Sequence, residues 1–287
     1  MSRPLYAYYG HHKCASTWIE SICESVCHEL GINFKIVYEA KDVNYDLQGY
    51  VNDHKIDFLA FANADYELVK TLGPDVKAFH VVRDPRDIIV SAYFSHLKTH
   101  PTHAWPELVA YRSELQNLDK DAGLFREIQF REEQFKEMLG WPELAETPNI
   151  IEIKMEELTV NPYEGFLDIF EFLGLVKNHG FNPSLRSKHL VSKVFRKLEA
   201  RTGVNVPIAN LGQLPAEMIL GIVWEYGFKR MTGGRKKGVV DENSHYRKGI
   251  AGDWVNELNA EHVEEIRSRY NSVILRYGYE QDPDWKL

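Results

Sequence analysis

The sequence predicts an α/β protein with a P-loop-like, three-layer fold, in which helices flank a central parallel sheet. Five short apolar runs rich in β-branched and aromatic residues predict the strands: residues 5–9, 34–40, 56–63, 78–83 and 149–155. Helix-like stretches separate these runs, as in the βαβ units of a parallel sheet, and the runs are nearly continuously apolar, as in strands covered on both faces. No change in composition marks a linker, so we expect residues 1–287 to form a single domain.

Composition excludes several classes of protein. A net charge of −8 argues against a general nucleic-acid binder, which would carry a basic face. No apolar run reaches the roughly 18 residues that a membrane span needs, and a strand that begins by Leu5 leaves no room before it for a signal peptide. The chain has three cysteines, an odd number that gives no disulfide framework, so we expect a cytoplasmic protein.

The first predicted strand leads into a candidate anion site. Residues 5–9 enter a turn at Gly10, and a helix-period run begins at Ser16. A strand, turn and helix in this order direct free backbone N–H groups and a helix N-terminus at one point. Lys13 adds a positive charge there, and Ser16 and Thr17 add hydroxyl groups. This arrangement predicts a cradle for a phosphate-like anion.

The turn is not the usual nucleotide-binding loop, which needs a second glycine and a lysine directly before its Ser/Thr. Here Ala15 takes the glycine position, Ser16 takes the lysine position, and Lys13 comes three residues earlier. The spacing His-Lys-x-x-Ser-Thr-Trp instead resembles the 5′-phosphosulfate loop of the sulfotransferase family. The resemblance implies that the donor is bound by His12, Lys13, Cys14, Ala15, Ser16, Thr17 and Trp18.

A second motif follows the fourth predicted strand, which ends at Arg83. Pro85 suits the first turn of a helix, and Ser91 stands eight residues after Arg83. A forked guanidinium and a hydroxyl can together bind a phosphate. The segment closely resembles the sulfotransferase motif in which the residues at these two positions bind the 3′-phosphate of the donor. In the alternative interpretation, the charges of this motif only pair with one another and cap a helix.

A third segment, residues 246–256, resembles the family's C-terminal motif Arg-Lys-Gly-x-x-Gly-Asp-Trp without a gap. In the family this loop folds over the donor, which implies that Arg247, Lys248 and Gly249 complete the 3′-phosphate site. The alternative is a solvated charged turn. Upstream, Gly-Phe-Lys-Arg-Met resembles the family's Ser-Phe-x-x-Met, which implies that the ring of Phe228 stacks on adenine.

The resemblance covers nearly the whole chain and is closest to the cytosolic sulfotransferases. It implies that 3′-phosphoadenosine 5′-phosphosulfate (PAPS) donates a sulfuryl group to a hydroxyl or amine of a small molecule, without a metal. By analogy with phosphoryl transfer, Lys13 would be catalytic because it stabilises the leaving phosphate. Residues 99–139 are charged and aromatic and predict a helical cap, which suggests an apolar or aromatic acceptor. The competing hypotheses are a P-loop kinase or NTPase and a catalytically silent nucleotide-binding scaffold.

The general base is where the sequence departs from the cytosolic enzymes. Those enzymes carry a catalytic histidine just after the third strand, and Asn63 stands near that position here. An asparagine cannot accept a proton, so Asp65 and Glu39, which follow the third and second predicted strands, are equal candidates. His96 and His12 are weaker ones. The family's dimer motif is largely absent, so the oligomeric state is left open.

Overall fold

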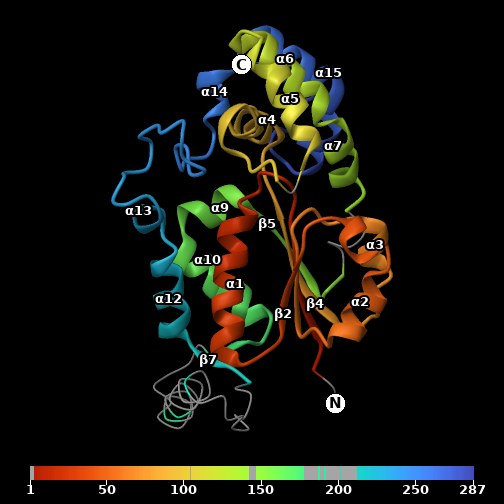
Figure 1. The fold of residues 1–287 in the computed structure, drawn as a ribbon, viewed down its shortest axis with the longest axis vertical. Helices are drawn as coiled ribbons and strands as arrows, with labels where there is room; N and C mark the ends of the chain where they lie inside the picture. Colours follow the sequence, from red (N-terminus) through yellow and green to blue (C-terminus); the bar gives the residue numbers. More distant parts are fainter. Residues whose placement is uncertain are drawn as a thin grey trace.

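The computed structural model describes residues 3–103, 105–141, 147–177 and 212–287, together with residues 187, 191 and 201. At its centre lies a five-stranded parallel sheet in the order β2-β3-β1-β4-β5 (Figure 1). The strands are β1 (Leu5–Tyr9), β2 (Phe34–Val37), β3 (Phe58–Phe61), β4 (Val76–Val82) and β5 (Ile150–Lys154). Each lies within or overlaps one of the five apolar runs, so the predicted α/β class and parallel sheet are confirmed.

Helices cover both faces of this sheet (Figure 1). One face carries α1 (Ser16–Leu30), α9 (Met155–Val160), α10 (Pro162–Phe172) and α12 (Ala216–Glu225), and the other carries η1 (Ala40–Val43), α2 (Leu47–His54) and α3 (Tyr66–Lys70). Alternate side chains of β1 point to opposite faces of the sheet. Tyr6 and Tyr8 pack with α1, while Ala7 and Tyr9 pack with α2 and α3. This double burial explains why the strands are continuously apolar.

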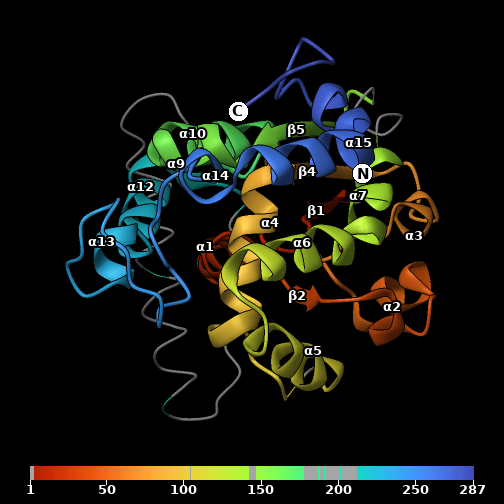
Figure 2. The ribbon, with the colours of Figure 1, turned by 90° about the horizontal axis from the view of Figure 1, so that it is seen from above.

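A third group of helices lies beyond the carboxyl ends of the strands (Figures 1 and 2). Its members are α4 (Pro85–Phe94), the π-helical turn η2 (Ser95–Thr99), α5 (Glu107–Gln116), α6 (Lys120–Phe130), α7 (Glu132–Leu139) and α15 (Ala260–Arg276). They share a core of their own, so the predicted helical cap is confirmed. The remaining described elements are the short pair β6 (Val176–Lys177) and β7 (Leu214–Pro215), with α13 (Phe228–Met231) and α14 (Trp254–Glu257).

The connections place the candidate site at the carboxyl edge of the sheet. The chain leaves β1 for β2 and β3 on one side and then crosses to β4 on the other, so β1 is the strand where the direction of winding changes. Ligands of open parallel sheets bind beyond the carboxyl ends of the strands at such a point. None of the described helices is both long enough and apolar enough to cross a membrane.

The ends of two strands differ from the predicted runs for local reasons. The second run was expected to reach residue 40, but β2 ends at Val37 because Glu39 is the N-cap of η1, where its backbone N–H donates to Asp42 Oδ2 at 2.9 Å. The third run was expected to reach Asn63, but β3 ends at Phe61, since Asp65 caps α3 and the chain turns between them. In both cases a helix-capping hydrogen bond ends the strand two or three residues before the apolar run ends.

One buried acid in α1 makes stability depend on pH. Glu20 is 6% exposed, and its Oε1 has no hydrogen-bond partner in the part of the chain that the structure describes. Burial, aided by the charge of Glu24, raises the pKa of Glu20 to about 7. Unfolded glutamate ionises near pH 4.3, so the folded state loses stability as the pH rises from about 4.3 to about 7.

We therefore expect Glu20→Gln to raise the free energy of unfolding relative to the natural chain by about 3–4 kcal/mol at pH 8 but by only about 1 kcal/mol at pH 5. Urea unfolding at both pH values measures this difference. Glu24→Gln, on the exposed side of α1, is the matched control and should have a smaller effect. Equal pH dependence of the Glu20→Gln variant and the natural chain would show that the buried carboxyl is not the cause.

Candidate active site

The turn between β1 and α1 has the backbone of an anion cradle. Lys13 and Ala15 both adopt left-handed conformations, with φ of 66° and 64°, which cost non-glycine residues about 1–2 kcal/mol each. This conformation leaves four backbone N–H groups without an acceptor among the described residues, those of Lys13, Ala15, Ser16 and Thr17. Successive free N–H groups at a helix N-terminus bind anions.

Lys13 supplies the charge of this cradle. Within the described chain its ammonium group forms no ion pair with a carboxylate. Burial lowers its pKa to about 7, and the nearby positive charges of Arg83 and Arg131 act in the same direction. A half-buried ammonium beside other cations lacks the anion that would stabilise its charged form, so the site is electrostatically suited to a phosphate or sulfate group.

Arg83 joins the second motif to the first. Its Nη1 donates to the carbonyl oxygen of Lys13 at 2.9 Å, while its Nε is buried and has no hydrogen-bond partner among the described residues. Pro85 opens α4 as predicted, and Ser91 lies half-buried two turns into that helix. The guanidinium of Arg83 therefore lies at the cradle with donor capacity left for a ligand.

The neighbouring charges of the second motif have structural partners. Asp84 caps α4 by accepting from the backbone N–H of Arg86 at 2.9 Å. Arg86 is buried and pairs with Asp84 at 2.7 Å and with Glu280 at 2.5 Å. Pairing and capping thus account for Asp84 and Arg86, as the alternative interpretation expected, but they leave the Nε of Arg83 free.

Asp87 attaches the third segment to α4. This buried carboxylate accepts from the backbone N–H groups of Gly252 at 2.6 Å and Trp254 at 3.1 Å, and it lies 3.9 Å from Arg83 Nη2. Three segments distant in the sequence therefore meet around the cradle, through Arg83 and Asp87. The sequence analysis assigned no ligand-site role to Asp87, although its place in Arg-Asp-Pro-Arg-Asp was a usable signal.

The cations of the third segment are held in ion pairs within the segment and with α14. Arg247 pairs with Asp253 at 2.5 Å and with Glu257 at 2.9 Å, and Lys248 also pairs with Asp253. The guanidinium of Arg247 lies over the ring of Phe94, 4.1 Å from its centroid, which sets this segment against α4. A phosphate bound here would have to displace the carboxylate of Asp253 from Arg247 and Lys248, or share these two cations with it.

Phe228 and Gly249 lie in contact at the start of α13. A Cβ atom built on Gly249 would stand 2.3 Å from the ring of Phe228, and Gly249 has φ of 68°, so only glycine fits there. The guanidinium of Arg235 lies 5.3 Å from the centroid of the same ring. Trp18 anchors α1 nearby by donating from Nε1 to the carbonyl oxygen of Tyr226 at 3.0 Å.

The other residues of the first loop differ in what they can offer a ligand. Thr17 is exposed at the start of α1, so its hydroxyl is accessible. The hydroxyl of Ser16 turns inward and accepts from Tyr8 at 3.1 Å. Cys14 is fully buried, and burial raises the pKa of its thiol to about 12, so it is neither an anion nor a nucleophile at neutral pH.

Both candidate bases already have structural partners. Asp65 caps α3 by accepting from the backbone N–H of Leu68 at 2.9 Å, and Glu39 pairs with Lys41 at 2.5 Å. Asn63 lies beside the cradle, because the next residue, Ala64, donates its backbone N–H to the carbonyl oxygen of Gly10 at 2.9 Å. The position that carries the base in the cytosolic enzymes thus adjoins the site.

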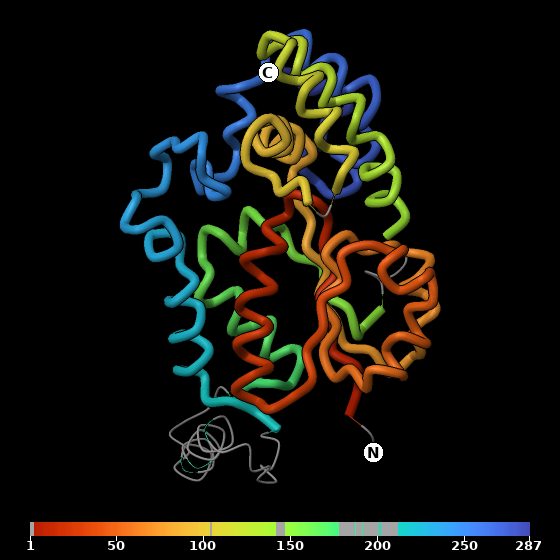
Figure 3. Tube along the Cα trace, in the orientation of Figure 1, coloured from red at the N-terminus to blue at the C-terminus, as the bar shows by residue number. Residues whose placement is uncertain are grey.

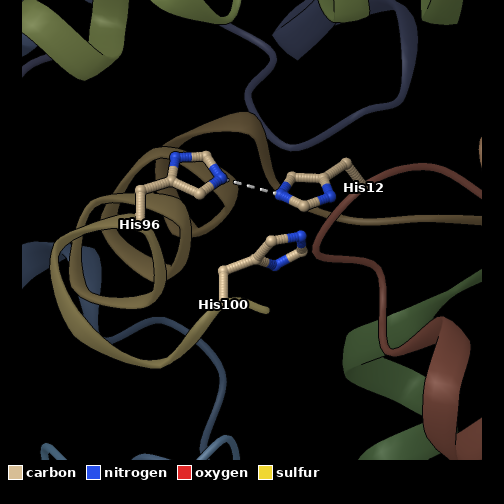
Figure 4. A group of neighbouring side chains, drawn as sticks. All are labelled: His12, His96 and His100. Carbon is tan, nitrogen blue, oxygen red and sulfur yellow. Dashed lines mark hydrogen bonds between the residues drawn. The ribbon is translucent and has the colours of Figure 1, made fainter. Parts of the chain in front are cut away.

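Histidines surround the loop on the side of the cap. His12 Nε2 and His96 Nε2 lie 3.0 Å apart, and a ring nitrogen of His100 lies within 4.8 Å of a ring nitrogen of each (Figure 4). The neighbouring His11 pairs with His80 on β4 at 2.7 Å, where it is buried. The sequence analysis missed His100, although its spacing of four from His96 in a helical segment was a signal.

Comparison with known proteins identifies a family match and similar folds. The sulfotransferase domain family matches residues 63–278. The structure is similar to mouse sulfotransferase SULT7A1 complexed with PAP, with a TM-score of 0.50, 16% identity and coverage of 96% of this chain and 86% of that one. It is also similar to retinol dehydratase in complex with androsterone and the inactive cofactor PAP, with a TM-score of 0.54, 13% identity and coverage of 96% and 82%.

The chain therefore belongs to the sulfotransferase family and is a PAPS-dependent sulfotransferase. The family match spans the second and third motifs, while the structural likeness covers 96% of the chain and shows the shared fold. The path of the chain around the loop, Arg83 and the third segment follows the arrangement that the sequence motifs predicted.

Proposed function

We propose that this enzyme transfers the sulfuryl group of PAPS to a hydroxyl or amine of a small, apolar or aromatic acceptor. The observation that carries the proposal is the half-buried ammonium of Lys13, which has no carboxylate partner in the described part of the chain, beside free N–H groups and with Arg83 bonded to the Lys13 carbonyl oxygen. PAPS is charged at both its 5′ and 3′ ends, so it complements a site with two separate cationic groups.

Each part of the site has a proposed role in the transfer. Lys13, Thr17 and the N-terminus of α1 bind the 5′-phosphosulfate and stabilise the charge that develops on the leaving phosphate. Arg83 and Ser91 bind the 3′-phosphate, and the third segment closes over it with Arg247 and Lys248. Sulfuryl transfer is an in-line displacement, so catalysis depends on positioning and electrostatics, by analogy with phosphoryl transfer.

The surroundings of the loop support an apolar acceptor. Aromatic rings of the cap stack beside His96, with Tyr111 and Phe130 centroids 4.1 Å apart and Trp105 and Phe130 centroids 6.0 Å apart. Aromatic side chains combine apolar area with defined geometry, which suits a flat hydrophobic molecule. These rings also belong to the core of the cap, so a packing role accompanies any role in binding.

Isothermal titration with 3′,5′-adenosine bisphosphate (PAP), set against ATP with Mg²⁺, tests the donor site. We expect micromolar or tighter binding of PAP and much weaker binding of ATP. A preference for ATP would favour the P-loop kinase or NTPase hypothesis. Transfer of labelled sulfate from PAPS to a panel of phenols, alcohols and amines then tests the reaction. Equal inactivity of the natural chain and Lys13→Ala on every acceptor would favour the silent scaffold.

The base can be identified with two conservative variants. We expect either Asp65→Asn or Glu39→Gln to lower kcat by about 100-fold or more, since an amide cannot accept the acceptor's proton. Asparagine still caps a helix, so thermal unfolding of Asp65→Asn should match that of the natural chain and separate a catalytic effect from a structural one. Undiminished turnover in both variants would remove both candidates.

A further inference from the structure

Three imidazole rings converge at the edge of the donor loop (Figure 4). His12 comes from the loop after β1, His96 from η2, and His100 follows η2 directly. The nearest ring nitrogens of all three lie within 4.8 Å of one another, and those of His12 and His96 are 3.0 Å apart. A tetrahedral metal ion with bonds of 2.0–2.1 Å separates its ligand atoms by about 3.3 Å, so modest ring movements bring the three into coordination.

His96 is oriented by a buried carboxylate. Its Nδ1 lies 3.0 Å from Glu127 Oε2, which also accepts from the Tyr111 hydroxyl at 2.9 Å, and Arg131 pairs with the other oxygen at 2.8 Å. With Arg131 and Tyr111 holding this carboxylate, its contact with His96 fixes the ring proton of His96 on Nδ1, which leaves the lone pair of Nε2 directed at the other two rings. Histidines that bind metals are commonly held by a carboxylate in this way.

The backbone around the three rings is also tied down. Arg112 donates to the carbonyl oxygens of His96 and His100, from Nε and Nη2, at 2.6 Å in each case. Gln134 donates to the carbonyl oxygen of His12 at 2.8 Å. His100 Nδ1 is buried and has no hydrogen-bond partner among the described residues, so its bonding capacity is unused. His100 therefore contributes a buried imidazole with a ring nitrogen that the described residues leave unbonded.

We propose that His12, His96 and His100 form a binding site for a divalent transition-metal ion of the zinc type. Zinc, nickel and copper accept imidazole ligands, whereas magnesium and calcium prefer oxygen. Three neutral histidines leave at least one coordination position for a water or another oxygen ligand, as in catalytic rather than structural zinc sites. The site shares His12 with the donor loop, but it uses neither Lys13 nor Arg83 and does not depend on the proposed acceptor.

The protonation of the rings suits this ligand. A neutral imidazole has one N–H group and one nitrogen with a free lone pair, and that second nitrogen can bind a metal ion. With the ring proton of His96 on Nδ1, the 3.0 Å contact between the two Nε2 atoms requires His12 Nε2–H to donate to His96 Nε2. Coordination through both Nε2 atoms would require His12 to carry its proton on Nδ1 instead, a change of tautomer that releases no net proton.

The test uses the whole protein after treatment with a chelator, titrated with Zn²⁺ alone by calorimetry and with Co²⁺ as a visible-absorption probe. We expect one ion per chain with micromolar or tighter affinity, and Co²⁺ bands of a four- or five-coordinate site. His100→Ala should weaken binding about 100-fold or more, since it removes a ligand without touching the His12–His96 pair. Glu127→Gln should weaken it by about 10–100-fold.

His54→Ala, on the exposed end of α2, is the matched control and should bind as the natural chain does. Absence of stoichiometric binding, or equal affinity in His100→Ala and the natural chain, would overturn the proposal. PAP titration of the same chelator-treated protein tests the donor site independently of the metal site. If the protein binds PAP but not Zn²⁺, only the metal-site proposal fails.

Discussion

Replacing Arg83 with alanine is expected to weaken the binding of PAP by about 100-fold or more. Arg83 offers a buried Nε that no described residue bonds and a forked guanidinium that reaches the donor loop. Hydrogen bonds to charged groups contribute about 1.5–3 kcal/mol each, and each 1.4 kcal/mol changes affinity tenfold. Two such bonds to one phosphate therefore account for a loss of this size. Isothermal titration measures it.

Two further variants help to interpret the PAP affinity of Arg83→Ala. Arg83→Lys keeps the charge but loses the planar fork, so it should recover only part of the affinity. Arg276→Ala removes an exposed arginine at the end of α15 and should leave PAP binding unchanged. Thermal unfolding shows whether Arg83→Ala remains folded, since Arg83 also bonds to the Lys13 carbonyl. Unchanged PAP affinity in a folded Arg83→Ala protein would place the 3′-phosphate elsewhere.

The sheet was predictable because its signal is local. Strands buried on both faces must be apolar throughout, and five such runs separated by helical stretches allow few arrangements other than a parallel sheet. The ends of β2 and β3 were not predictable from apolar pattern, since they depend on the capping bonds of Asp42 and Asp65. The single domain and the open oligomeric state stay as predictions, because neither follows from the contacts within one chain.

The sequence predicted which segments form the site, but it did not predict which side chains pair with one another there. Motif spacing indicated that the loop, Arg83 and the third segment share a ligand, and the structure brings them together through Asp87. Sequence could not show that Asp253 already neutralises Arg247 and Lys248, since side chains choose partners only in the folded chain. Sequence reasoning named His12 and His96 singly but did not bring them together with His100, because η2 is a π-helical turn and sequence patterns do not reveal such turns.

Loss of Asp87 is expected to cost about 3–4 kcal/mol of folding free energy and to weaken PAP binding at the same time. Asp87→Ala leaves the N–H groups of Gly252 and Trp254 without their acceptor and removes the carboxylate nearest Arg83. Breaking a buried charged partner in this way costs more than the net value of the pair, because the remaining groups stay desolvated. Urea unfolding with and without saturating PAP measures both effects.

Comparison of several variants shows whether the carboxylate of Asp87 holds the third segment at the site. Asp87→Asn keeps one acceptor oxygen, so it should lie between Asp87→Ala and the natural chain in stability. Asp168→Ala, an exposed acid on α10, should change stability by less than about 0.5 kcal/mol. Amide hydrogen exchange at Gly252 and Trp254 should accelerate in Asp87→Ala alone, because these N–H groups then lack their bond. If those amides stay protected and PAP binds as before, the third segment is held at the site by contacts other than the carboxylate of α4.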